Sequence, residues 1–205
     1  TNWKQAKQVV GKAVLLSTVG VVLTAVVTGV FCYFILHFAF WESMLIGAVV
    51  SSTDAASVFS ILRSKHLSLK YNTASLLEIE SGSNDPCSYM LTVIILTIMS
   101  GKASGGALLL MIFAQVIFGM LVGVVTAGLT YFVLKKVKTT NDGFDTIFVF
   151  GMALLAYAFA SMIGGNGYLS VYIAGIILGN KPLHNKKSMV HFFDGITGLM
   201  QMLIF

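Results

Sequence analysis

The sequence predicts an all-α polytopic membrane protein with about six transmembrane helices and the start of another. Of its 205 residues, 57% are hydrophobic and 10% are charged, and the mean hydropathy is +0.88, which lies well outside the range of a soluble globular domain. The basic residues behind the formal net charge of +5 gather in short clusters between apolar runs. This distribution argues against a nucleic-acid partner and makes the lipid bilayer the expected surroundings.

The apolar runs define the spans, because a bilayer core about 30 Å thick needs roughly 20 apolar residues per helix. The run 13–40 contains no Asp, Glu, Lys or Arg, and 106–134 contains no charge at all. The run 146–180 is too long for one helix and contains the breaker Gly-Gly-Asn-Gly at 164–167, so we divide it there. The predicted spans are 13–40, 43–62, 72–100, 106–134, 146–163, 168–180 and a truncated 195–205.

The charges of the connecting loops support this division, because loops rich in Lys and Arg alternate with poor ones. The rich loops contain Lys4, Lys7 and Lys12, then Arg63, Lys65 and Lys70, then Lys135, Lys136 and Lys138, and finally Lys181, Lys186 and Lys187; the poor ones contain Lys102 or none. Under the positive-inside rule the rich loops are cytoplasmic. We therefore expect a multi-pass protein of the cell inner (plasma) membrane whose first residues are cytoplasmic.

Acidic residues interrupt two of these spans. Asp54 and Asp85 fall near the middle of their spans, and Glu78 and Glu80 lie about one to two turns from Asp85, at ~1.5 Å per residue. A charge at the bilayer centre costs roughly 2.5 to 3.5 kcal/mol on insertion scales. The predicted spans contain no Lys or Arg. The acids must therefore be neutralised by protons, by a metal cation, or by a base from outside this chain.

Protons and cations would compete for such a site. Burial beside other carboxylates favours the protonated form, whereas the ionised form offers hard oxygen ligands to an alkali cation. This competition is the simplest form of antiport. Asp54 and Asp85 are too short to reach the headgroups, whereas Glu78 lies nearest the cytoplasmic end, where its side chain can snorkel. For Glu80 we favour a structural ion pair with a missing base over direct ligation.

The backbone around these acids carries breaking signals. Pro86 cannot donate to the carbonyl of Gly82, so we expect a kink near Asp85 with a free backbone oxygen. The hydroxyl-bearing residues 51–53, just before Asp54, can bond back to their helix or line a polar break. Discontinuous helices near the midplane are the recurrent ion sites of secondary transporters.

Helical spacing places the polar side chains of the third span on shared faces. Glu80 lies on one face with Asn84, and Ser81 lies on one face with Asp85, since each pair is four residues apart. The cluster therefore offers one hydrogen-bonded pair and one pair of potential ligands.

The segments SSTDAASVFSILR (51–63) and EIESGSNDP (78–86) resemble the monovalent cation:proton antiporters of the sodium/proton exchanger superfamily, most closely its bacterial potassium/proton branch. The resemblance implies an inverted-repeat fold with a broken helix at the ion site, and no cofactor. It further implies that Asp85 exchanges a proton for potassium or sodium with Asp54 beside it. The remaining implied roles are ligation by the Thr53 backbone and Ser81, and support of Glu80 by Asn84.

Other family features are matched less fully. Asn84 before Asp85 is what electroneutral exchangers show, but Ala55 replaces the proline of the commoner Thr-Asp-Pro pattern. The likeness continues through GNGYLSVYIAGIILGN (165–180) and would cover about half of a family member's membrane domain. We therefore expect a piece of a longer protein, with the basic partner of Glu80 beyond Phe205 and no transport by this segment alone.

Two glycine patterns remain. Gly119 with Gly123, and Gly175 with Gly179, form small-xxx-small patterns that let helices approach closely. They are compatible with a homodimer interface and equally with packing inside one chain.

The favoured function is secondary transport by alternating access, which is not an enzymatic activity. An intramembrane aspartyl protease using Asp54 and Asp85 is the first alternative, but such enzymes carry Gly-x-Gly-Asp, and here Asn84 precedes the second acid. A passive cation channel lined by the acids is the second alternative.

Overall fold

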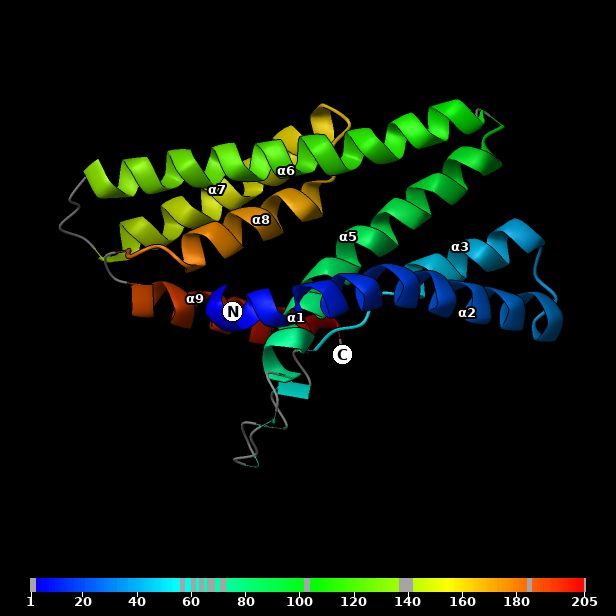
Figure 1. The fold of residues 1–205 in the computed structure, drawn as a ribbon, viewed down its shortest axis with the longest axis horizontal. Coiled ribbons are helices and arrows are strands. Elements are labelled where there is room, and N and C mark those ends of the chain that lie inside the picture. Colours follow the sequence, from blue (N-terminus) through cyan, green and yellow to red (C-terminus); the bar gives the residue numbers. More distant parts are fainter. Residues whose placement is uncertain are drawn as a thin grey trace.

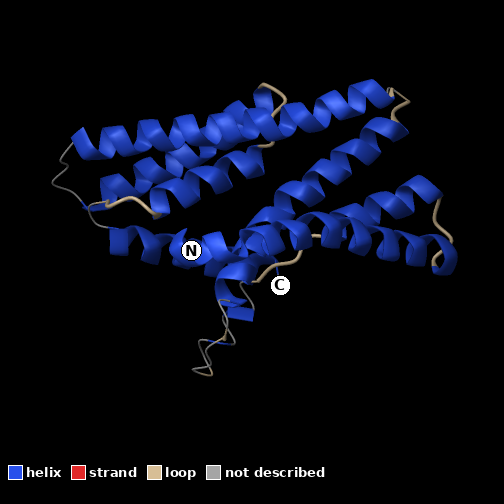
Figure 2. Cartoon of the chain, viewed as in Figure 1, coloured by secondary structure: helices blue, strands red, loops and turns tan. Residues whose placement is uncertain are grey.

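A computed structural model describes residues 3–55, 58–59, 62, 65, 69–70, 73–101, 104–136, 142–183 and 186–204. Within these ranges every regular element is a helix (Figure 2), so the predicted all-α class is confirmed. Several residues used in the sequence prediction lie outside the described ranges: Arg63, Lys102 and Lys138, the predicted span ends Asn72 and Phe205, and positions 56–57 and 60–61.

The first element is one continuous helical run made of α1 (Trp3–Leu15), a π-helical turn η1 (Leu16–Gly20) and α2 (Val21–Ile35). The other elements are α3 (Phe40–Val50), α5 (Thr73–Met99), α6 (Gly105–Lys136), α7 (Asp142–Met162), α8 (Gly167–Gly179) and α9 (Lys186–Ile204). Among the described residues, Lys7–Ile35, Gly105–Lys136 and Gly143–Met162 are long and apolar enough to cross a membrane. These lengths identify the chain as part of an all-α membrane protein.

Several helices differ from the predicted spans at their ends, and two of these differences show why. The first helix stops at Ile35, and His37 adopts the left-handed conformation with φ 56°, although the sequence stays apolar to Phe40. The last helix begins at Lys186, nine residues before the predicted start at 195. Apolar content was the criterion for the predicted spans, and it misses both an apolar turn and a polar helical turn.

The helices form two groups joined by α5. In Figure 1, α5 runs diagonally between α2 and α3 on one side and α6, α7 and α8 on the other. The contacts agree, because α2 packs on α3, α6 and α7 both pack on α8, and α5 contacts both α3 and α8. The helix that carries most of the predicted site is therefore held by both groups.

The contact between α6 and α8 depends on glycine. A Cβ atom on Gly119 would lie 2.9 Å from the carbonyl oxygen of Asn166, and one on Gly123 would lie 2.6 Å from that of Ser170. This glycine pattern therefore serves packing inside the chain. Cβ atoms on Gly175 and Gly179 would meet nothing within 4 Å, so a role for that pair stays a prediction.

Replacing Gly123 by Ala should destabilise the protein. The new methyl group must push the α8 backbone away, and such overpacking typically costs about 1–3 kcal/mol. We expect a lower melting temperature for Gly123→Ala in thermal unfolding of the purified full-length protein in detergent. Gly128→Ala on the same helix is the matched control, because a Cβ there meets nothing within 4 Å. Equal melting temperatures for the two variants would contradict the close approach of α6 and α8.

Candidate ion-binding site

The break in the second predicted span lies directly after α3. That helix ends at Val50, and residues 52–55 have no regular structure. The last turn of α3 is closed by serine hydroxyls: the carbonyl oxygen of Ala48 accepts from Ser51 Oγ at 2.7 Å and from Ser88 Oγ at 2.6 Å. The back-bonding expected from the hydroxyls of this segment is thus present at Ser51. The helix unwinds at the Ser-Ser-Thr-Asp motif without a proline.

The non-helical segment 52–55 is bonded to α5 through its backbone. The carbonyl oxygen of Thr53 accepts from Ser81 Oγ at 3.2 Å and from Asn84 Nδ2 at 2.9 Å. The amide of Ala55 donates to Ser81 Oγ at 3.1 Å. Residues 52–55 are not helical, so their backbone groups lack helical hydrogen bonds. Side chains on one face of α5 bond to these groups instead.

The side chains of the segment complete this network. Ser52 Oγ donates to the carboxylate of Asp85. Asn84 is 1% exposed, and its Nδ2 lies 2.6 Å from Thr53 Oγ1 and 3.3 Å from Glu80 Oε1. The contact between Asn84 and Glu80 is the one that the family resemblance implies. Hydroxyl, amide and carboxylate groups thus gather where the broken segment crosses α5.

The structure brings several of the predicted site residues into one hydrogen-bonded cluster. This hydrogen-bonded cluster contains Thr53, Glu80, Ser81, Asn84 and Asp85. The remaining predicted residues are Asp54, which is exposed and follows Thr53 in the segment, Glu78, which is exposed on α5, and Pro86, which is buried. The described residues contain no group of three or more His, Cys, Asp or Glu arranged for a metal ion. A cation here would therefore depend on neutral oxygens as well as carboxylates.

Pro86 lies within α5 and is bonded from outside that helix. Helix α5 is continuous from Thr73 to Met99 with Pro86 inside it. The carbonyl oxygen of Pro86 accepts from Asn166 Nδ2 at 2.9 Å. The free backbone oxygen expected at this turn is that of Gly82, four residues before Pro86, and it stays a prediction. The expected kink stays a prediction.

Asp85 borders two cavities. One, of about 460 Å³, lies among α5, α7, α8 and α9, and includes Gly82, Tyr157 and Tyr172 in its wall. The other, of about 390 Å³, extends along α5 to Thr92 and includes Ser52. Tyr168 is also part of both walls. Asp85 therefore lies where the linings of two cavities meet on α5.

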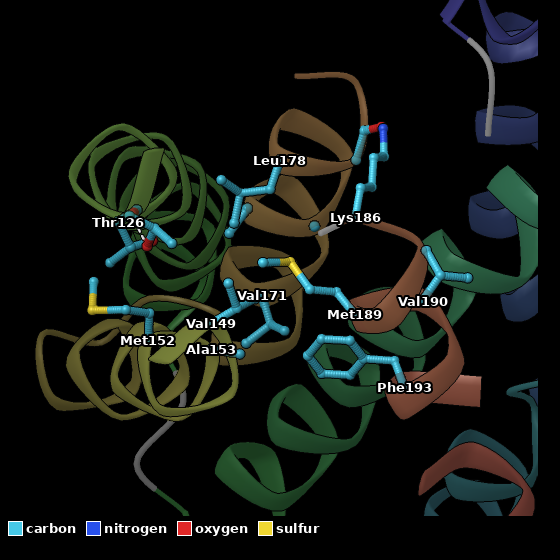
Figure 3. Close-up of a pocket in the computed structure, with 14 residues that line it drawn as sticks. Thr126, Val149, Met152, Ala153, Val171, Leu178, Lys186, Met189, Val190 and Phe193 are labelled. Atoms are coloured by element: carbon cyan, nitrogen blue, oxygen red, sulfur yellow. Dashed lines mark hydrogen bonds between the residues drawn. The ribbon is translucent and has the colours of Figure 1, made fainter. Parts of the chain in front are cut away.

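A third cavity, of about 320 Å³, is lined mostly by apolar side chains (Figure 3). Val171, Leu178, Met189 and Phe193 surround it in the figure, and Asp and Glu are absent from its described lining. Lys186 at its edge donates to the carbonyl oxygen of Gly179 and so caps α8. The described lining of this cavity therefore offers a cation no carboxylate.

Ser88 and Asn166 are buried polar residues that the sequence prediction does not include. Asn166 belongs to the Gly-Gly-Asn-Gly motif and is fully buried. Its side chain accepts from the amide of Leu169 at 3.0 Å and so caps α8. An Asn directly before an apolar helical run is an N-cap signal that could have been found. Its bond to Pro86, 80 residues away in the chain, has no local signal.

Comparison with known proteins identifies relatives of this chain. A K(+)/H(+) antiporter NhaP2 of Shewanella oneidensis is 36% identical over 196 residues, which cover 94% of this chain and 34% of that protein. A K(+)/H(+) antiporter NhaP of Alkalimonas amylolytica is 34% identical over 206 residues, covering 100% of this chain and 36% of the relative. A probable Na(+)/H(+) antiporter 2 of Methanocaldococcus jannaschii is 26% identical over 219 residues, or 51% of its length.

The chain thus spans about a third of the length of these K(+)/H(+) relatives. The family model described as "Sodium/hydrogen exchanger, transmembrane" matches residues 1–205, the whole chain. On that match, this chain belongs to the sodium/hydrogen exchanger family.

Proposed function

We propose that the full-length protein carrying this segment is a secondary transporter that exchanges protons for monovalent cations by alternating access. The observation that carries this proposal is the hydrogen-bonded crossing of the non-helical segment 52–55 with α5 beside Asp85. A broken helix near the midplane with carbonyl and carboxylate oxygens is the usual ion site of secondary transporters. The names of the relatives and of the family agree with it, and they favour it over a protease or a channel.

In this proposal Asp85 is the carboxylate that alternates between proton and cation, with Asp54 beside it. Thr53 and Ser81 add a carbonyl and a hydroxyl oxygen, which are hard ligands suited to an alkali cation. Glu80 and Asn84 brace the segment through their hydrogen bonds to Thr53. No cofactor takes part, because the chemistry is exchange of ions at oxygen ligands.

Potassium is the first cation to test, because relatives named K(+)/H(+) antiporters are 34–36% identical to this chain, against 26% for the relative named as a probable Na(+)/H(+) antiporter. We also propose an electroneutral exchange, on the Asn-Asp pair at 84–85, and a homodimer in the inner (plasma) membrane with the first residues cytoplasmic. A base beyond residue 205 is proposed to pair with Glu80, whose two bonds named above come from neutral groups.

Neutralising Asp85 should abolish exchange. An Asn side chain cannot carry the titrating proton and offers a weaker cation ligand. We expect Asp85→Asn to reduce potassium-driven proton movement in proteoliposomes of the full-length protein to the level of protein-free vesicles. Glu42→Gln is the matched control, since Glu42 lies in the first turn of α3 and outside the cluster; it should exchange like the parent. Intact exchange by Asp85→Asn would show that the site is wrongly assigned.

The proposed orientation predicts which loops are accessible from outside the cell. Ser104 precedes α6, Lys136 ends it, and both side chains are exposed. In a full-length variant without Cys32 and Cys87, a membrane-impermeant maleimide applied to intact cells should label Ser104→Cys and not Lys136→Cys. Permeabilised cells should label both. The reverse pattern in intact cells would mean that the first residues are outside.

A further inference from the structure

Asn166 connects three helices through hydrogen bonds from a fully buried position. Its side-chain oxygen caps α8 by accepting from the amide of Leu169 at 3.0 Å, and its Nδ2 donates to the carbonyl oxygen of Pro86 on α5 at 2.9 Å. Its backbone amide donates to the carbonyl oxygen of Gln115 on α6 at 3.0 Å. Both ends of the amide side chain are thus used, each by a different helix.

The carbonyl that Asn166 binds belongs to the residue directly after Asp85. Pro86 has no N–H, so α5 lacks the ladder bond that would normally reach back to the carbonyl of Gly82. This turn of α5 is therefore held less firmly by its own helix, and an outside hydrogen bond has more influence on its position. Asn166 supplies that bond from the side of α8, while Ser52 reaches Asp85 from the side of α3.

Asn166 lies in closely packed surroundings at the start of α8. Gly119 lies so close that a Cβ atom there would be 2.9 Å from the Asn166 carbonyl oxygen, and a Cβ on Gly165 would be 2.9 Å from the amide nitrogen of Gly119. Two residues after Asn166, the ring of Tyr168 packs against Tyr157, with ring centroids 5.3 Å apart. The start of α8 is thereby fixed against α6 and α7, so its bond to Pro86 transmits a defined position.

We propose that Asn166 is a positioning residue for the ion site: through the Pro86 carbonyl it sets where α5 presents the Asp85 carboxylate to segment 52–55, and so sets the apparent affinity for the cation. This inference rests on the proposed function. The competing explanation is a role in stability alone, as the N-cap of α8. The two differ in what they predict for the Michaelis constant.

The test uses Asn166→Asp in the full-length protein in proteoliposomes. Aspartate keeps the shape and the cap acceptor but replaces the Nδ2 donor by an oxygen facing the Pro86 carbonyl. We expect the apparent KM for potassium to rise about tenfold, which is the loss of roughly 1.4 kcal/mol, within the range for one buried hydrogen bond. Size-exclusion chromatography quantifies the folded protein. The maximal rate per folded protein should fall by a smaller factor than the apparent affinity for potassium.

Asn180→Asp is the matched control, because Asn180 Nδ2 likewise donates to a backbone carbonyl, that of Ile176 at 2.8 Å, but at the other end of α8. Its KM should stay at the parental value. Asn166→Ser is the second variant, since serine is a good cap and cannot reach Pro86; it should raise KM in the same way, even if Asn166→Asp fails to fold.

Unchanged KM in Asn166→Ser, with loss confined to the melting temperature or maximal rate, would overturn the positioning role. Equal KM changes in Asn180→Asp and the Asn166 variants would overturn it too. A parent protein that shows no cation-driven proton movement would instead refute the proposed function, so the two failures are distinguishable.

Discussion

The structure depends on satisfying the backbone of a broken helix by hydrogen bonds from its neighbour. At membrane depth, a carbonyl or amide without a partner costs several kcal/mol, because no water replaces the lost helical bond. Segment 52–55 leaves α3 and finds its partners on α5, where Ser81 and Asn84 bond to the backbone of Thr53 and Ala55. The polar face of α5 is therefore needed for folding before it is needed for any chemistry.

A second constraint acts on α5 from the opposite group of helices. Glycine contacts bring α6 and α8 to backbone distance, and this approach buries Asn166 at the start of α8, from which it reaches Pro86. The turn of α5 that carries Asp85 is thus bonded to segment 52–55 through Ser52, to α3 through Ser88, and to α8 through Asn166. A turn weakened by proline is stabilised by partners outside its own helix.

The features behind these two constraints differ in how far the sequence predicts them. Composition and loop charges predict the helical class. The Ser-Ser-Thr-Asp run, together with the family resemblance, indicates a helix break in this region, because hydroxyl groups beside an acid are a local signal. The turn at His37 and the start of α9 at Lys186 were not predicted, because apolar content does not determine where a helix begins or ends. The bond between Asn166 and Pro86 was not predicted, because the Gly119–Gly123 pattern indicates a close helix contact but neither that α8 is the partner helix nor that Asn166 reaches Pro86.

The same hydrogen bonds bear on how a cation would enter under the proposed exchange. The carbonyl oxygen of Thr53 has two lone pairs, and both already accept, from Ser81 and Asn84. The carboxylate of Asp85 accepts from Ser52. A cation that used these oxygens would have to displace donors, and a hydroxyl can rotate its hydrogen away and offer its own lone pair instead, whereas an amide N–H cannot. Ser52 and Ser81 are therefore the groups able to change from donor to ligand while Asn84 keeps the segment in place, so that exchange needs no separate unfolding of the break.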